Sequence, residues 1–197
     1  MRKTLNLVAV VFSILMFVGV AKADQLIFTA TMTGAQEVPP TGSPGVGSVL
    51  LTIDTVTNLM TVNVSFAGLV SPTTIAHIHC CAGPGGIAIP ATTVPSFPGF
   101  PVGVTTGTFL GTFDLSLASS FNPAFITASG GTVAAAQAAF IAGLLNGQAY
   151  FNIHTQQFPS GEIRGQLNEI PEPATMLLLA TGIMGVAGAM RKRRKHL

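Results

Sequence analysis

The chain has few charged residues and few aromatic residues other than phenylalanine. Asp, Glu, Lys and Arg make up 8% of its 197 residues, tryptophan is absent and there is one tyrosine. Eight of the nine basic residues lie near the two ends, at positions 2, 3, 22 and 191–195. Between positions 24 and 170 the only basic residue is Arg164, against six acids. Nucleic-acid binding requires clustered lysine and arginine, so we expect no nucleic-acid partner.

Cysteine is almost absent, and the two that occur are adjacent, Cys80 and Cys81. The chain therefore lacks the paired Cys-x-x-Cys spacing of a zinc site. In an oxidising compartment the pair could form a vicinal disulfide, an intermolecular bridge or two metal ligands. A vicinal disulfide needs a strained ring, because ordinary bridges join Cα atoms more than about 4 Å apart. The alternative is two small residues in a turn, and we favour the vicinal disulfide or this alternative over metal ligation.

Common catalytic signatures are also missing. No Gly-x-Ser-x-Gly motif marks a nucleophile, and the acids are too few and scattered to suggest a glycosidase pair. The glycine-rich residues 83–86 lack the Lys and Ser/Thr of a phosphate-binding loop. These absences favour a non-catalytic protein.

Long apolar runs occupy both ends of the chain. Near the N-terminus, basic positions 2 and 3 precede an apolar stretch over 5–20, and Ala21-Lys22-Ala23 fits a cleavage site. This pattern predicts a signal peptide over residues 1–23, with an uncleaved membrane anchor as the alternative.

The C-terminal region has three parts in order. The motif Pro171, Glu172 and Pro173 precedes an apolar run over 174–190 and five basic residues at 191–195. About 20 apolar residues span a bilayer, and a basic flank stays on the cytoplasmic side. We therefore predict a transmembrane helix over 174–190, with the preceding chain outside the cytoplasm.

This arrangement over residues 170–197 resembles the PEP-CTERM sorting signal of Gram-negative bacteria. The resemblance implies that an exosortase recognises the chain. It also implies transient anchoring in the inner membrane, removal of the tail, and delivery to the cell surface or the exopolysaccharide matrix. A plain single-pass tail anchor is the alternative.

The central segment, residues 24–169, is long enough to form one domain with its own core. Closely spaced Gly and Pro and many β-branched residues favour an all-β fold. Residues 82–104 hold five prolines and five glycines and predict a long loop. Residues 132–145 predict a helix that Ser129 or Thr132 caps and Asn146-Gly147 ends. Strands are expected at 26–33, 47–54, 59–66, 73–79, 106–115, 149–155 and 162–167. The pattern predicts a β-sandwich or Greek-key barrel with one inserted helix.

Four blocks of this segment resemble, in order, the CHRD domain, which is named for chordin. The blocks are residues 34–40 (GAQEVPP), 76–79 (AHIH), 149–155 (AYFNIHT) and 159–167 (PSGEIRGQL). The resemblance implies an exported module with an immunoglobulin-like β fold, and it implies no reaction. The chain departs from the family at Cys80-Cys81 and in the long Pro-rich loop.

Three of the four histidines fall in two of these blocks. Alternate residues of a strand point to the same face, so His77 and His79 share a face, and His154 shares one with Asn152. In the final hairpin, a symmetric turn over 156–160 would set His154 opposite Glu162. Directly paired residues have Cβ atoms about 4.5–5.5 Å apart, within hydrogen-bonding reach.

If their strands are neighbours, His77, His79 and His154 form a three-imidazole site. Glu162 would then be a fourth ligand or would bond to a ligand. Imidazole suits Cu, Zn, Ni and Fe(II), and thiolates of the cysteine pair would favour copper or zinc. The alternative is a hydrogen-bonded network that pins the last hairpin to its neighbour.

Two hypotheses of function follow. The first is a non-catalytic binding or structural module at the cell surface or in the extracellular matrix, which associates with exopolysaccharide or a surface protein. The second is a copper- or zinc-dependent redox or hydrolytic protein built on the histidine-rich face. Phe97, Phe100 and Phe109 are either an exposed binding patch or side chains that cover the core.

Overall fold

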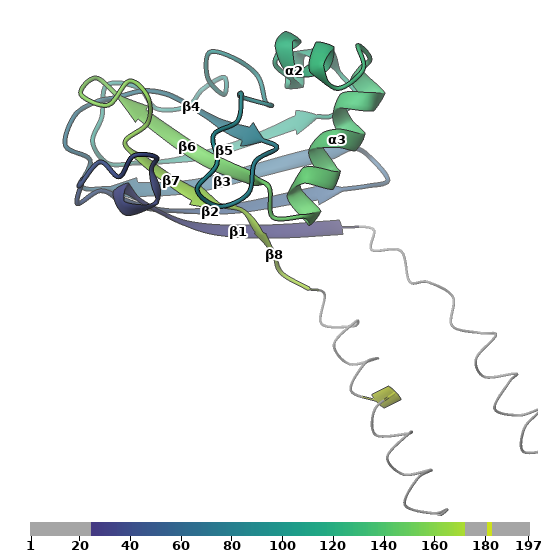
Figure 1. Ribbon diagram of the computed structural model, residues 1–197, viewed down its shortest axis with the longest axis horizontal. Coiled ribbons are helices and arrows are strands. Elements are labelled where there is room, and N and C mark those ends of the chain that lie inside the picture. The colour runs from purple at the N-terminus through teal and green to yellow at the C-terminus, as the bar shows by residue number, and fades with distance from the viewer. Residues whose placement is uncertain (1–24, 172–180, 183–197) are drawn as a thin grey trace, which may run out of the picture.

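The computed structural model describes residues 25–171 and 181–182. Its centre is an eight-stranded antiparallel sheet with the strand order β4-β6-β7-β1-β2-β3-β5, in which β8 also pairs with β1 (Figure 1). The strands are β1 (Gln25–Thr33), β2 (Val46–Asp54), β3 (Leu59–Ala67), β4 (Thr73–Cys80), β5 (Gly107–Asp114), β6 (Ala149–Thr155), β7 (Ile163–Gln166) and β8 (Asn168–Glu169).

The mainly β prediction is confirmed. All seven expected strands occur within one residue of their expected bounds, and only the two-residue β8 was not expected. The strands form one curled sheet, in which seven strands lie on one path and β8 lies off it, paired with β1. The immunoglobulin-like Greek-key arrangement therefore stays a prediction.

The β2–β3 hairpin shows why the strand positions could be predicted from the sequence. Buried and exposed side chains alternate along both strands, as they do where one face packs on a core and the other meets water. At the turn, Asp54 accepts hydrogen bonds at 2.8 Å from the backbone N–H groups of Val56 and Thr57. Asn58 adopts a positive φ of 61°, which asparagine tolerates well.

The core lies within the curl of the sheet. Phe97, from the long loop, has its ring 5.9 Å from that of Phe151 on β6 and 4.9 Å from that of Phe113 on β5. It therefore links β6, the second strand of the order, to β5, the last. Phe97, Phe100 and Phe109 are all buried, so they cover the core and do not form an exposed patch.

Two α-helices occur between residues 25 and 171, where one was expected, and both lie at one end of the sheet (Figure 1). The expected helix is α3 (Val133–Leu145), whose N-cap Thr132 accepts a hydrogen bond from the N–H of Ala135. The missed helix is α2 (Pro123–Ala128), where Asn122 caps the start and Pro123 takes the first position. It is only six residues long, which is too short to show a periodic pattern. Two 3₁₀ turns, η1 (Gly34–Gln36) and η2 (Ala118–Ser120), complete the elements.

Apart from residues 181–182, the expected signal peptide and membrane helix lie outside the described residues. The signal peptide over 1–23 and the membrane helix over 174–190 stay predictions, as do the domain bounds that depend on them. Within the described residues, no helix is long and apolar enough to cross a membrane.

Candidate metal centre

The centre is built on three neighbouring strands, β4, β6 and β7. The pairing of β4 with β6 sets His77 opposite Asn152 and His79 opposite Tyr150. The pairing of β6 with β7 sets Asn152 opposite Arg164. The strands of the two histidine blocks are therefore neighbours, which is the condition that the three-imidazole site required, and one face of these strands carries a row of polar side chains.

The three imidazoles of His77, His79 and His154 form one cluster. The ring of His77 lies 4.6 Å from that of His79 and 4.7 Å from that of His154, measured between centroids. One ring nitrogen from each histidine lies within 4.8 Å of the other two. All three side chains are buried, with at most 8% of their surface exposed.

Each histidine bonds to a backbone carbonyl through its Nδ1 atom. The acceptors are the carbonyl oxygens of Pro95 for His77 (3.1 Å), Ala88 for His79 (2.7 Å) and Pro159 for His154 (2.9 Å). A carbonyl oxygen can only accept, so each Nδ1 carries the proton. In a neutral imidazole the other nitrogen, Nε2, is then a bare acceptor.

The Nε2 atoms of His77 and His154 face each other, 3.0 Å apart. The Nε2 of His79 is buried and has no hydrogen-bond partner among the described residues. With Nδ1 protonated in each ring, the three histidines of this cluster carry three Nε2 lone pairs for which the described residues supply no donor.

Burial keeps these rings neutral. Desolvation, and then the charge of His154, lowers the pKa of His77 to about 4. Desolvation, and then the charge of His77, lowers the pKa of His79 to about 3. Desolvation also lowers the pKa of His154. At neutral pH the cluster therefore carries three uncharged imidazoles.

The long loop over 82–104 covers one side of the cluster. Its backbone runs along the free edge of β4, where Ala91 N–H donates to the carbonyl of Ile78 (2.8 Å). Further along, Phe97 N–H donates to the carbonyl of Ala76 (3.0 Å). The same loop supplies the carbonyls of Ala88 and Pro95. The segment that sequence analysis identified only as a loop therefore orients two of the three histidines.

A second group of side chains surrounds the cluster. Tyr150 stacks on His79, with ring centroids 4.7 Å apart. The guanidinium carbon of Arg164 lies 3.8 Å from the centre of the Tyr150 ring, and its Nη1 donates to Gly86 O at 3.0 Å. Asn152 donates to the carboxyl of Glu37, whose pKa burial raises to about 7. Sequence analysis did not connect Glu37 with this site, although it lies in the first CHRD-like block.

Glu162 lies apart from the three-histidine cluster. It is fully buried, and its carboxylate accepts hydrogen bonds of 2.6 Å from Ser43 Oγ, Val70 N–H and Thr155 Oγ1. These contacts join β6 to two loops that are distant in sequence. The structure therefore gives this carboxylate an anchoring position, and the expected hydrogen bond to His154 is not among its contacts.

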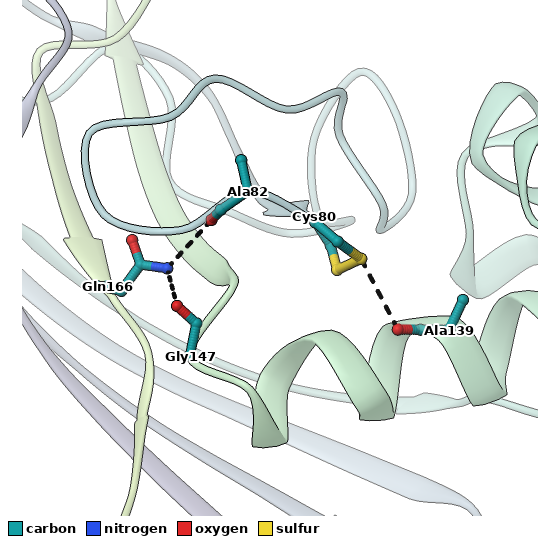
Figure 2. Close-up of a disulfide and its surroundings, with 6 residues drawn as sticks. Cys80, Ala82, Ala139, Gly147 and Gln166 are labelled. Atoms are coloured by element: carbon teal, nitrogen blue, oxygen red, sulfur yellow. Dashed lines mark hydrogen bonds between the residues drawn. A yellow bond between two sulfur atoms is a disulfide. The ribbon is translucent and has the colours of Figure 1, made fainter.

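Cys80 and Cys81 are joined by a disulfide, so they offer no thiolate to the histidines. The bridge packs on α3, where the sulfur of Cys81 lies 3.7 Å from the carbonyl oxygen of Ala139 (Figure 2). A Cβ at Gly143 would overlap the sulfur of Cys80, so glycine makes room for the bridge. The nearby Gln166 amide donates to Gly147 O (2.6 Å) and Ala82 O (3.4 Å), so it joins the residue after the disulfide to the turn that follows α3.

Comparison with known families finds two matches in the chain. Residues 169–194 match the PEP-CTERM protein-sorting motif, which identifies an exported protein that an exosortase sorts to the cell surface or beyond. No curated protein and no solved structure matches the chain. Residues 28–167 match the CHRD domain. This range includes the three histidines of the cluster and the side chains around them. The protein therefore belongs to the CHRD domain family.

Proposed function

We propose that this exported domain is a metal-binding module that holds one copper or zinc ion at the Nε2 atoms of His77, His79 and His154. One observation carries the proposal: three buried imidazoles are held by carbonyls at Nδ1 and turn their unprotonated nitrogens toward a common point. Imidazole is a good ligand for both metals. A bond from Nδ1–H to a carbonyl is also the usual way in which proteins orient a ligating histidine.

Counting protons distinguishes this proposal from a simple hydrogen-bonded network. A hydrogen bond between His77 and His154 would need a proton on one Nε2. That ring would then either lose the Nδ1 proton that its carbonyl needs, or become charged, which burial opposes. A buried acceptor left without a donor costs about 1–3 kcal/mol. A cation accepts all three lone pairs without a proton.

The spacing of the nitrogens fits a metal ion after a small adjustment. Zinc–nitrogen bonds of about 2.0–2.1 Å place ligand nitrogens roughly 3.3–3.6 Å apart. The observed cluster has one pair at 3.0 Å and no pair beyond 4.8 Å. Side-chain movements of about 1 Å would close the set.

A binding role suits this site better than a catalytic one. The imidazoles are buried, and the two buried acids among the described residues, Glu37 and Glu162, are occupied by hydrogen bonds to other groups. A general base must lie within hydrogen-bonding reach of the reacting group. Glu162 then supports the site from outside by fixing β6.

Metal analysis of the purified full-length protein tests the proposal. We expect about one equivalent of copper or zinc per chain. A His77→Ala, His79→Ala double variant should lose it, while His196→Ala, the control at the fourth histidine of the sequence, should keep it. Circular dichroism checks that each variant is folded. A folded wild-type chain that takes up no metal from either salt would refute the proposal.

We also infer that the chain is anchored in the inner membrane before its tail is removed, and that it then joins the cell surface or the exopolysaccharide matrix. The sorting motif supports this inference. Mass spectrometry of the mature protein from its host tests it. The expected mass lacks both the first 23 residues and the basic tail, and a full-length mass would contradict the inference.

A further inference from the structure

We propose that the three-histidine site selects a monovalent ion, Cu(I), over the divalent ions Zn(II) and Cu(II). The inference depends on the proposed metal site and specifies its occupant. It follows from the charges that surround the converging Nε2 atoms.

The ligands bring no negative charge. All three are imidazoles whose protons sit on Nδ1 and bond to carbonyls. The cysteine sulfurs are joined in a disulfide, so no thiolate is at hand. Of the two buried acids, Glu162 is held by Ser43, Val70 and Thr155. A divalent ion would therefore keep its full charge within the ligand set.

A fixed positive charge lies close by. Arg164 is buried and always protonated, and its guanidinium contacts the Tyr150 ring that stacks on His79. Glu37 is the acid coupled to Arg164, and burial raises the pKa of its carboxyl to about 7, so its charge is only about half developed at neutral pH. The repulsion between Arg164 and a bound ion is proportional to the charge of the ion, so it is twice as large for a divalent ion.

Burial acts in the same direction. The three histidines have 4%, 8% and 6% of their surface exposed, so the site offers little water to a bound ion. The cost of moving an ion out of water grows with the square of its charge, which makes it about four times larger for a divalent ion. A divalent ion would need an added anion such as hydroxide, whereas Cu(I) is stable with three neutral nitrogen ligands alone.

Cu(I) and Zn(II) form a matched pair of probes, because both have a filled d shell and they differ in charge. The full-length protein is titrated without oxygen, with bathocuproine disulfonate as the competitor for Cu(I) and a chromophoric chelator for Zn(II). A thiol assay confirms that the disulfide stays closed. We expect one Cu(I) per chain with a Kd about 1,000-fold below that of Zn(II). His196→Ala should bind like the wild type.

Two charge variants locate the cause of the selectivity. Arg164→Gln should tighten binding of Zn(II) by about the square of the factor by which it tightens binding of Cu(I), because the Coulomb energy doubles with ion charge. Glu37→Gln should weaken Zn(II) more than Cu(I). If Arg164→Gln does not fold, Glu37→Gln still tests the charge argument.

The outcomes separate this inference from the proposed function. A Zn(II) or Cu(II) affinity within about tenfold of the Cu(I) affinity, lost in the His77→Ala, His79→Ala variant, refutes the monovalent preference and leaves the metal site standing. Cu(I) binding that survives in this double variant, or no binding of any ion, refutes both. Tight Cu(I) binding that the double variant abolishes, with weak Zn(II) binding, supports both.

Discussion

The outer face of the sheet has two regions, an open face and a covered face, which share the same alternating pattern and differ in their surroundings. On β1, β2, β3 and β5, the register aligns Thr31, Ser48, Ser65 and Thr108 in one row of exposed hydroxyls. On β4, β6 and β7, the corresponding positions carry His77, His79, Asn152 and Arg164, and all of these are buried. The difference is the cover, because the loop over 82–104 runs beside β4.

The comparison shows how a covered polar face becomes a chemical site. On the open face, hydroxyls bond to each other or to water, as Ser48 and Ser65 do at 2.9 Å. On the covered face water is excluded, so each polar atom needs a partner in the protein. The loop carbonyls of Pro95 and Ala88 accept from the Nδ1 atoms of His77 and His79, and the Nε2 atoms of the cluster are left without a donor among the described residues.

The largest expected effect comes from removing the anchor of the covered face. Glu162→Ala removes a fully buried carboxylate and leaves three donors without their acceptor, on the buried Thr155, the half-buried Ser43 and the exposed Val70. We expect a loss of about 3–5 kcal/mol in the free energy of unfolding, measured by urea denaturation. Glu169→Ala, on the exposed β8, is the control and should cost under about 0.5 kcal/mol. Equal losses in the two variants would mean that burial does not separate these acids.

The next effect is an acid sensitivity that only the covered face can cause. The pKa values of the three histidines are lowered in the folded apoprotein, so the unfolded chain binds more protons and stability falls as the pH drops from about 6.5 toward 4. Glu37 acts in the opposite sense, because its raised pKa stabilises the fold below about 4.5 and this contribution is lost as the pH rises through 7.

Near pH 5 unfolding should take up protons at His77 and His79, whose pKa values of about 4 and 3 in the folded protein lie below this pH, and at His154, whose pKa is also lowered, while Glu37 releases one. The Glu37→Gln variant lacks this release, so its stability should fall more steeply with acid. Urea denaturation of the apoprotein from pH 5 to 6.5 measures the slope. A slope of zero in both proteins would show that the histidines titrate normally and are not desolvated.

The smallest expected effect is the difference in free energy of unfolding between two Thr→Val variants, one on each face. Thr92 is fully buried in the loop, and its Oγ1 accepts the N–H of Ile78 at 2.9 Å. Thr92→Val should therefore cost about 1–3 kcal/mol, because it strands a buried donor. Thr108→Val on the open face should change stability by less than about 0.5 kcal/mol. Similar values for the pair, from thermal or urea unfolding, would mean that the loop does not exclude water from β4.

The fold and the histidine cluster differ in how far the sequence could predict them. Strand alternation is local, so it placed the strands and set His77 and His79 on one face. The symmetric turn over 156–160 that sets His154 opposite Glu162 also sets Asn152 opposite Arg164, and the structure has this pair. The partners of Glu162 could not be predicted, because Ser43 and Val70 come from loops that have no periodic pattern.

The cover over the histidines was unpredictable for a similar reason. Residues 82–104 are rich in Pro and Gly, which indicates a loop but not its path. The backbone carbonyls of Ala88 and Pro95 carry no sequence signal at all, yet they fix the protons of His77 and His79. The convergence of the Nε2 atoms therefore needed the tertiary structure.

The pairing of β8 with β1 has a mechanical consequence. Glu169 lies opposite Phe28, and Ile170 N–H donates to Ile27 O at 2.8 Å, so the start of β1 and the end of β8 lie side by side. Opposing forces applied to these two chain ends would break the hydrogen bonds between β1 and β8 one after another, and would not load them all in shear. Tension transmitted along the sorting segment would therefore detach a two-residue strand first and leave the remaining seven strands to bear load only afterwards.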